Sequence, residues 1–192
     1  MLKNLYQFLT NFLQLRTMGV TQMKEDYESE IVSLFREAEQ LLEKAKEKLQ
    51  RFYSEHGLGW SKESIRGLKG DIYAKVLGKY LEKKTKKKAQ YEKTISGRIR
   101  ADILLDKVEV ESKVQGIFDL NIFERRWKRV NEKRPDLVHL VVGWRHNPIW
   151  AEKVRKVVGE NNHFMLFNVK SKQHIPSELK RLVVTIKQEG SS

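Results

Sequence analysis

The stretch "IRADILLDKVEVESKV", residues 99–114, alternates aliphatic and polar side chains, a pattern typical of β-strands. A two-residue turn at Asp106 and Lys107 would fold it into a hairpin of two strands, residues 98–105 and 108–114. In this register Asp102 lies directly opposite Glu111, with Cβ atoms about 5 Å apart. Because side chains alternate along a strand, Lys113 shares the face of both carboxylates.

The hairpin is therefore predicted to have one apolar and one charged face. The apolar face collects Ile99, Ala101, Ile103, Leu105, Val108, Val110 and Val114, and the charged face collects Arg98, Arg100, Asp102, Glu111 and Lys113. Two opposed carboxylates repel unless positive charge lies between them. Two interpretations remain open: solvated ion pairs with the basic neighbours, or a divalent cation held by carboxylate oxygens, with a lysine assisting a bound water.

The rest of the chain predicts an α/β fold. Helical periodicity spans residues 61–82, a first strand covers 89–95, and a helix follows the hairpin over 118–133. Buried strands are expected over 136–144 and 163–169, separated by a helix over 147–160 and followed by one over 176–188. This order predicts a mixed central sheet flanked by helices on both faces. His139 lies in one of the apolar strands and is expected to be a core residue.

The N-terminal part predicts a helical arm, residues 1–56, ahead of a domain over 57–192. Residues 1–15 form a short amphipathic leader, for which a groove is the simplest partner and a membrane surface the alternative. From Gln22 to His56 apolar residues recur at alternating spacings of three and four, as in a two-stranded coiled coil. We therefore expect a homodimer through this helix, although packing back on the domain remains open.

The charge of the chain favours polyanionic partners. The net charge is +13, and the long helix over 22–56 carries 6 basic and 9 acidic residues, so the basic character belongs to the rest of the chain. Two basic runs are candidate DNA contacts, with solvated helix ends as the alternative meaning. Together with Arg98 and Arg100 these candidates are Lys83, Lys84, Lys86, Lys87, Lys88, Arg125, Arg126 and Lys128.

This sequence lacks the residues or motifs that several functional classes require. It contains no cysteine, which excludes disulfides and thiolate chemistry. It has no phosphate-binding loop, dinucleotide fingerprint or serine-hydrolase motif. No run approaches the roughly 18 apolar residues that a membrane span needs, so we expect a cytoplasmic protein without a membrane partner.

The segment "RADILLDKVEVESK" resembles the Asp and Glu-x-Lys core of the PD-(D/E)xK nuclease superfamily, with Ala101 where that family has proline. The predicted element order over residues 61–169 is similar to the core of its restriction-endonuclease-like fold. The long helix, the "HGLGW" joint and the later "FERRWKRV" and "DLVHLVVGW" segments also resemble archaeal nuclease-like proteins with an N-terminal coiled coil. The resemblance covers about two thirds of the chain.

The resemblance implies an endonuclease that acts on DNA and depends on Mg²⁺ or Mn²⁺. Asp102, Glu111 and the backbone carbonyl of Ser112 would bind the metal ion, and Lys113 would assist the attacking water. The family often adds a glutamate from the preceding helix. That glutamate is absent after Gly70 here; Asp71 is the nearest candidate and Glu63 the next. The rival hypotheses are a non-catalytic DNA-binding or scaffold protein that retains the fold, and a coiled-coil interaction protein with acidic partners.

Overall fold

The computed structural model describes residues 27–58, 63–97, 99–114, 119–145, 148–168, 170–171 and 173–190 of the chain. The predicted leader over residues 1–15 and the candidate DNA contact Arg98 lie outside these ranges. The chain divides into two compact units, Met1–Glu30 and Ile31–Ser192, and the fold described below is that of the second unit. The boundary predicted after residue 56 falls inside this unit.

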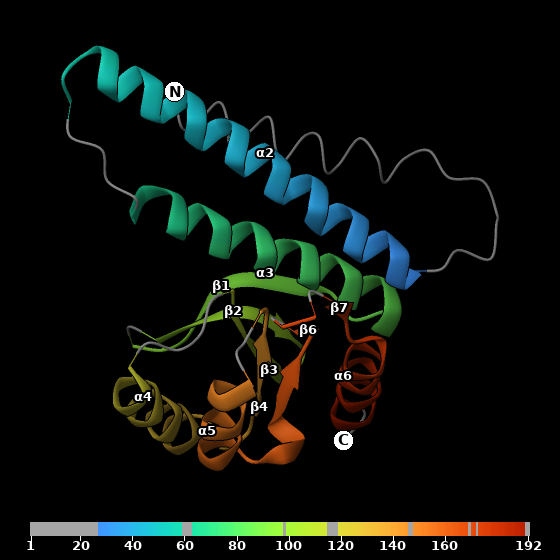
Figure 1. Ribbon diagram of the computed structural model, residues 1–192. Coiled ribbons are helices and arrows are strands. Elements are labelled where there is room, and N and C mark those ends of the chain that lie inside the picture. The colour runs from blue at the N-terminus through green and yellow to red at the C-terminus, as the bar shows by residue number, and fades with distance from the viewer. Residues whose placement is uncertain are drawn as a thin grey trace. The chain divides into compact units, whose positions relative to one another are not determined.

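A five-stranded mixed sheet forms the middle of the unit (Figure 1). The strands lie side by side in sequence order: β1 (Ala89–Ser96), β2 (Ile99–Leu105), β3 (Val108–Lys113), β4 (Val138–Gly143) and β5 (His163–Met165). Neighbours among the first three are antiparallel, whereas β3, β4 and β5 run parallel and are joined through helices. The predicted α/β class and mixed sheet are confirmed; the restriction-endonuclease-like topology stays a prediction.

Helices lie on both faces of the sheet (Figure 1). Their bounds are α3 (Glu63–Thr85), α4 (Leu120–Lys133), α5 (Pro148–Val158) and α6 (Pro176–Glu189). On the α3 side, Tyr91 pairs with Ile103 in the ladder and donates a hydrogen bond to the Lys75 carbonyl. Glu111, which alternates to the opposite face, meets Arg126 of α4. None of the described helices is both long and apolar enough to cross a membrane.

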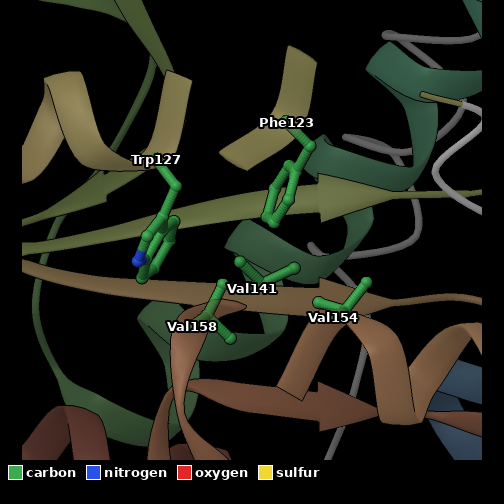
Figure 2. Close-up of a cluster of buried hydrophobic side chains, with 5 residues drawn as sticks. All are labelled: Phe123, Trp127, Val141, Val154 and Val158. Carbon is green, nitrogen blue, oxygen red and sulfur yellow. The ribbon is translucent and has the colours of Figure 1, made fainter. Parts of the chain in front are cut away.

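The face covered by α4 and α5 has its own apolar cluster, which fixes the position of α4 over the sheet. Figure 2 shows Phe123 and Trp127 of α4 facing Val141 of β4, with Val154 and Val158 of α5 completing the group. Each helix presents its apolar residues at spacings of three or four, as an amphipathic helix must to bury one stripe. Full burial of such a side chain stabilises the fold by roughly 1.5–3 kcal/mol.

Helix α2 (Tyr27–Glu55) packs against the rest of the second unit through residues 31–42. Its side chains Ile31, Phe35, Ala38 and Leu42 are buried. The Phe35 ring lies 4.4 Å from that of Tyr73 and 3.8 Å from that of Trp144, between centroids. Ile31 and Ala38 belong to the apolar repeat that the spacing assigned to a coiled coil, whereas Phe35 and Leu42 lie beside that repeat. The homodimer predicted through this helix stays a prediction.

The chain after β5 differs from the single strand predicted over residues 163–169. Strand β5 ends at Met165, and Phe167–Asn168 (β6) then pairs with Gln173–His174 (β7) in a separate two-stranded sheet. Strand β4 ends at Gly143, and its pair with Met165 is the last of the ladder. The Leu166 N–H still donates to the Gly143 carbonyl, but the Leu166 carbonyl accepts from the Ile175 N–H instead. The apolar run alone does not reveal where the neighbouring strand stops.

Candidate functional site

The three pairs that β2 and β3 form next to the turn have the predicted register, but the predicted pair of Asp102 with Glu111 is not among them. Asp106 and Lys107 form the turn, and Asp106 takes φ of 52°, a left-handed conformation that aspartate tolerates better than most residues. The paired residues are Leu105 with Val108, Leu104 with Glu109, and Ile103 with Val110. Along β2 the residues alternate between buried and more exposed, as the two-faced hairpin predicts.

Beyond the pair of Ile103 and Val110, the Asp102 side chain, rather than the backbone of β2, accepts the next hydrogen bond from β3. Its Oδ2 accepts a hydrogen bond from the Ser112 N–H at 2.7 Å. In an extended strand the N–H and C=O of one residue point toward the same neighbour. The Ser112 carbonyl, a predicted metal ligand, therefore faces the side of β3 on which Asp102 lies.

Glu111 is buried at 2% exposure on the α4 side of β3. Its Oε1 forms an ion pair with Lys113, and its Oε2 lies 2.5 Å from Nη1 of Arg126. Burial acts to raise the pKa of Glu111, but the charges of Lys113 and Arg126 outweigh burial and lower it. Glu111 is therefore ionised at neutral pH, and both of its oxygens face cations.

Asp102 has the opposite tendency. Burial, followed by the negative charge of Glu111, raises the pKa of Asp102 to about 7, against the influence of Lys113, the Ser112 N–H and Arg126. The two carboxylates are thus close enough to interact. Near neutral pH Asp102 exchanges its proton readily, and a cation placed between the two side chains would favour its ionised form.

A third carboxylate, to which the sequence assigned no role, lies on the same face. Glu109 and His139 are each 2% exposed, and Oε2 of Glu109 lies 3.1 Å from Nδ1 of His139. The other ring nitrogen, Nε2, lies 3.1 Å from the Arg134 carbonyl, which can only accept. Nε2 therefore carries a proton, and a second proton lies between the ring and Glu109. His139 is a hydrogen-bonded core residue, as expected.

Burial is the main reason that the pKa of Glu109 is raised. The charge of Glu111 acts in the same direction, whereas His139 and Arg126 act against it. The sequence did hold a signal for this residue, because glutamates two apart in a strand share a face. What it did not reveal is that α4 would cover that face and bury both carboxylates.

Asp71, the candidate from the preceding helix, lies on α3. It forms an ion pair with Lys75 at 3.1 Å on the same helix. Burial, and then the charge of Glu92 on β1, raise the pKa of Asp71. Among the residues that the structure describes, no group of three or more His, Asp or Glu side chains is arranged to hold a metal ion. A metal site here would consist of two carboxylates and backbone or water oxygens.

The candidate DNA contacts lie in two separate places. The run from Lys83 to Lys88 leads into β1, whose first residue pairs with Leu105 at the turn end of the hairpin. Lys87 binds the Asp106 carboxylate at 2.9 Å and the Gly190 carbonyl at 2.8 Å, so this lysine ties the turn to the end of α6. The carboxylate cluster lies toward the other end of the two strands.

Helix α4 carries the second group. Arg125 and Lys128 are exposed; Nε of Arg125 donates to the Asn121 carbonyl, and Lys128 pairs with Glu124. Arg126 instead turns inward to Glu111, which differs from the surface role predicted for it. Its Nη2 also donates to the carbonyl of the exposed Arg100 at 3.0 Å. The sequence does not distinguish Arg126 from Arg125 and Lys128, because the direction of each side chain depends on how α4 lies on the sheet.

A polar cluster that the sequence did not predict joins α2, α3 and the segment after β4. Glu39 accepts from the Tyr73 hydroxyl and forms ion pairs with Lys69 and Arg145. On the same side, Nε1 of Trp144 donates to Oγ of Ser112 at 3.0 Å. Glu39 thereby fastens α2 to the segment that follows β4.

No family model matches this chain, and neither a curated protein nor a solved structure matches it. The residues themselves define what the site can do. Asp102 and Glu111, two carboxylates of different proton affinity, lie with Lys113 at one end of a hairpin face. Arg126 reaches this group from α4. Such a group can bind a cation, hold a water or phosphate oxygen, and exchange a proton near neutral pH.

Proposed function

We propose that the protein is a metal-dependent endonuclease that hydrolyses phosphodiester bonds in DNA, with the restriction-endonuclease-like fold that its sequence resembles. The observation that carries the proposal is the gathering of Asp102, Glu111 and Lys113 around the end of β3. Ser112, whose carbonyl is the further predicted ligand, lies beside Asp102 and donates its N–H to the Asp102 carboxylate.

The donor atoms suit a hard divalent cation such as Mg²⁺ or Mn²⁺. The carboxylates of Asp102 and Glu111 would hold the ion, with the Ser112 carbonyl as a further oxygen ligand. When bound, the ion polarises a phosphoryl oxygen and makes a coordinated water more acidic. Lys113, already at the Glu111 carboxylate, can donate hydrogen bonds to a water or a phosphate oxygen at the same place.

DNA as the substrate follows from charge. The positive charge of the chain lies outside the long helix over 22–56, and the exposed basic residues of α4 stand next to Arg126 of the cluster. Phosphate neutralisation by lysine and arginine supplies most of the sequence-independent affinity of proteins for DNA. The proposed site thus lies beside a surface suited to the DNA backbone.

Cleavage assays on supercoiled, linear, single-stranded and four-way-junction DNA test the proposal, each with Mg²⁺, with Mn²⁺ and with a chelator. We expect metal-dependent cleavage of at least one form, and a loss of at least about 100-fold for Asp102→Asn and for Glu111→Gln. Asp136→Asn and Glu124→Gln are the matched controls, because each carboxylate forms an ion pair with a residue two or four positions away on the surface.

Two results would overturn the nuclease. One is the absence of cleavage of every DNA form with either metal ion, and the other is cleavage that survives in both site variants. DNA binding measured on the same samples separates a chemical defect from a binding defect, since the conservative variants should still bind. Circular dichroism spectra confirm that each variant is folded.

The second candidate function is DNA binding without catalysis, and one observation favours it. Lys113 and Arg126 already neutralise Glu111, so the carboxylate cluster is electrostatically balanced without a metal ion. This function predicts DNA binding that ignores Mg²⁺ and chelators and that is unchanged in Asp102→Asn. The nuclease predicts that the metal ion tightens DNA binding and that Asp102→Asn removes this effect.

A further inference from the structure

Glu111 holds both of its carboxylate oxygens against cationic side chains of the protein itself. Lys113 faces Oε1, and Nη1 of Arg126 lies 2.5 Å from Oε2. The side chain is 2% exposed, so these ion pairs are little weakened by solvent. The residue that would be a principal metal ligand is thus already occupied by two cations.

The two cations come from different elements and differ in chemistry. Lys113 follows Glu111 on β3 and shares its face, which suits a role beside the bound water. Arg126 reaches across from α4, and its Nη2 donates to the Arg100 carbonyl on β2 at 3.0 Å. A guanidinium does not lose its proton in proteins, so Arg126 leaves this pair only by moving.

A divalent cation and Arg126 have conflicting requirements at Glu111. When all are ionised, the charges of Asp102, Glu111, Lys113 and Arg126 sum to zero, and a bound divalent cation would raise the sum to +2. Like charges this close repel strongly where solvent is scarce. The Arg126 side chain is 32% exposed, so this residue borders solvent.

We propose that Arg126 competes with the metal ion for Glu111 and keeps the site ion-paired until the metal ion displaces it. This inference rests on the proposed function. The displaced guanidinium retains its hydrogen bond to the Arg100 carbonyl and turns its remaining N–H groups outward, where a DNA phosphate can accept them. Arg126 is thus a positioning residue that couples metal binding to contact with the substrate backbone.

Titration of Mn²⁺ into the full-length protein without DNA, followed by the electron paramagnetic resonance of the free ion, tests this competition. We expect Arg126→Gln to bind Mn²⁺ about tenfold more tightly than the wild type, because the competing charge is gone. Arg125→Gln is the matched control and should bind as the wild type does, since its guanidinium contacts the Asn121 carbonyl on the helix surface. Glu111→Gln should bind far more weakly.

The outcomes separate this inference from the function on which it rests. If the wild type binds Mn²⁺ and Arg126→Gln binds it equally or more weakly, the proposed competition is overturned, but the proposed nuclease function is not. Absence of Mn²⁺ binding in the wild type and in Arg126→Gln overturns both. If Arg126→Gln does not fold, the NMR signal of Arg126 Nε–H in the wild type decides. It must shift in step with Mg²⁺ binding, and a signal that stays fixed while Mg²⁺ binds overturns the competition.

Discussion

The Asp102 carboxyl group is subject to opposing influences. Burial and the charge of Glu111 raise its pKa from 3.8 to about 7, although Lys113, the Ser112 N–H and Arg126 favour the ionised form. Between about pH 4 and pH 7 the native protein therefore keeps a proton that the unfolded chain has lost. The free energy of unfolding contributed by this group falls as the pH rises through that window, and is constant above it.

Asp102→Asn should reduce this pH dependence, because the amide does not ionise while its oxygen still accepts from Ser112. One pKa unit corresponds to about 1.4 kcal/mol, so the variant should gain up to about 4 kcal/mol relative to the wild type between about pH 4 and pH 8. Urea unfolding across this range measures the difference. Asp136→Asn, at an exposed residue whose pKa Arg134 lowers, should show no such gain. Parallel curves for Asp102→Asn and wild type would rule out Asp102 as the titrating group.

At this scale, the sequence predicts which residues share a face, because alternation along a strand is a local property. It brings Asp102, Glu111 and Lys113 together correctly as neighbours. It does not separate Arg126 from Arg125, since the direction of each side chain depends on where α4 lies over the sheet. The pairing of Glu109 with His139 was missed for a similar reason: it joins strands that are distant in sequence.

At the scale of elements, the hairpin was predictable and the arrangement of α2 was not. A two-residue turn between alternating strands leaves few choices of register, and the observed pairs agree with the predicted one. Helix α2 has apolar residues at spacings of three and four, which serve equally for a partner helix or for the helix's own domain. Only the position of Tyr73 and Trp144 decides that the first half packs inward.

Substitution of Phe35 tests this packing. Phe35→Ala should lower the free energy of unfolding by about 3–4 kcal/mol, because a ring buried against Tyr73 and Trp144 leaves a cavity. Phe52→Ala, on the same helix but 39% exposed, should cost less than about 1 kcal/mol. Urea unfolding measures both. If Phe35→Ala is as mild as Phe52→Ala, or if its effect appears only as a change in oligomeric state, then α2 does not pack on its own domain in solution.

At the scale of the second compact unit, the sheet separates two basic groups. The run from Lys83 to Lys88 adjoins the turn end of the hairpin, where Lys87 is engaged with Asp106. The exposed cations of α4, Arg125 and Lys128, neighbour Arg126 on the helix, and Arg126 forms an ion pair with Glu111 of the carboxylate cluster. The sequence treats both runs alike as candidate DNA contacts, because charge composition carries no information about position in the fold.

This separation gives a prediction about DNA binding that removes equal charge from each group. Replacing Arg125 and Lys128 with glutamine should weaken DNA binding at least about tenfold and lower the slope of log affinity against log salt by about 1 for each phosphate that the variant no longer neutralises. Replacing Lys86 and Lys88 in the same way should have a smaller effect, because DNA seated at Asp102 and Glu111 lies toward the other end of the hairpin. Fluorescence anisotropy with labelled duplex DNA at several salt concentrations, in the presence of a chelator, measures both slopes.

Equal weakening by the two double variants would mean that DNA binds across the sheet without regard to the carboxylate cluster. Greater weakening by the Lys86 and Lys88 pair would place the DNA at the turn end and argue against cleavage at Asp102 and Glu111.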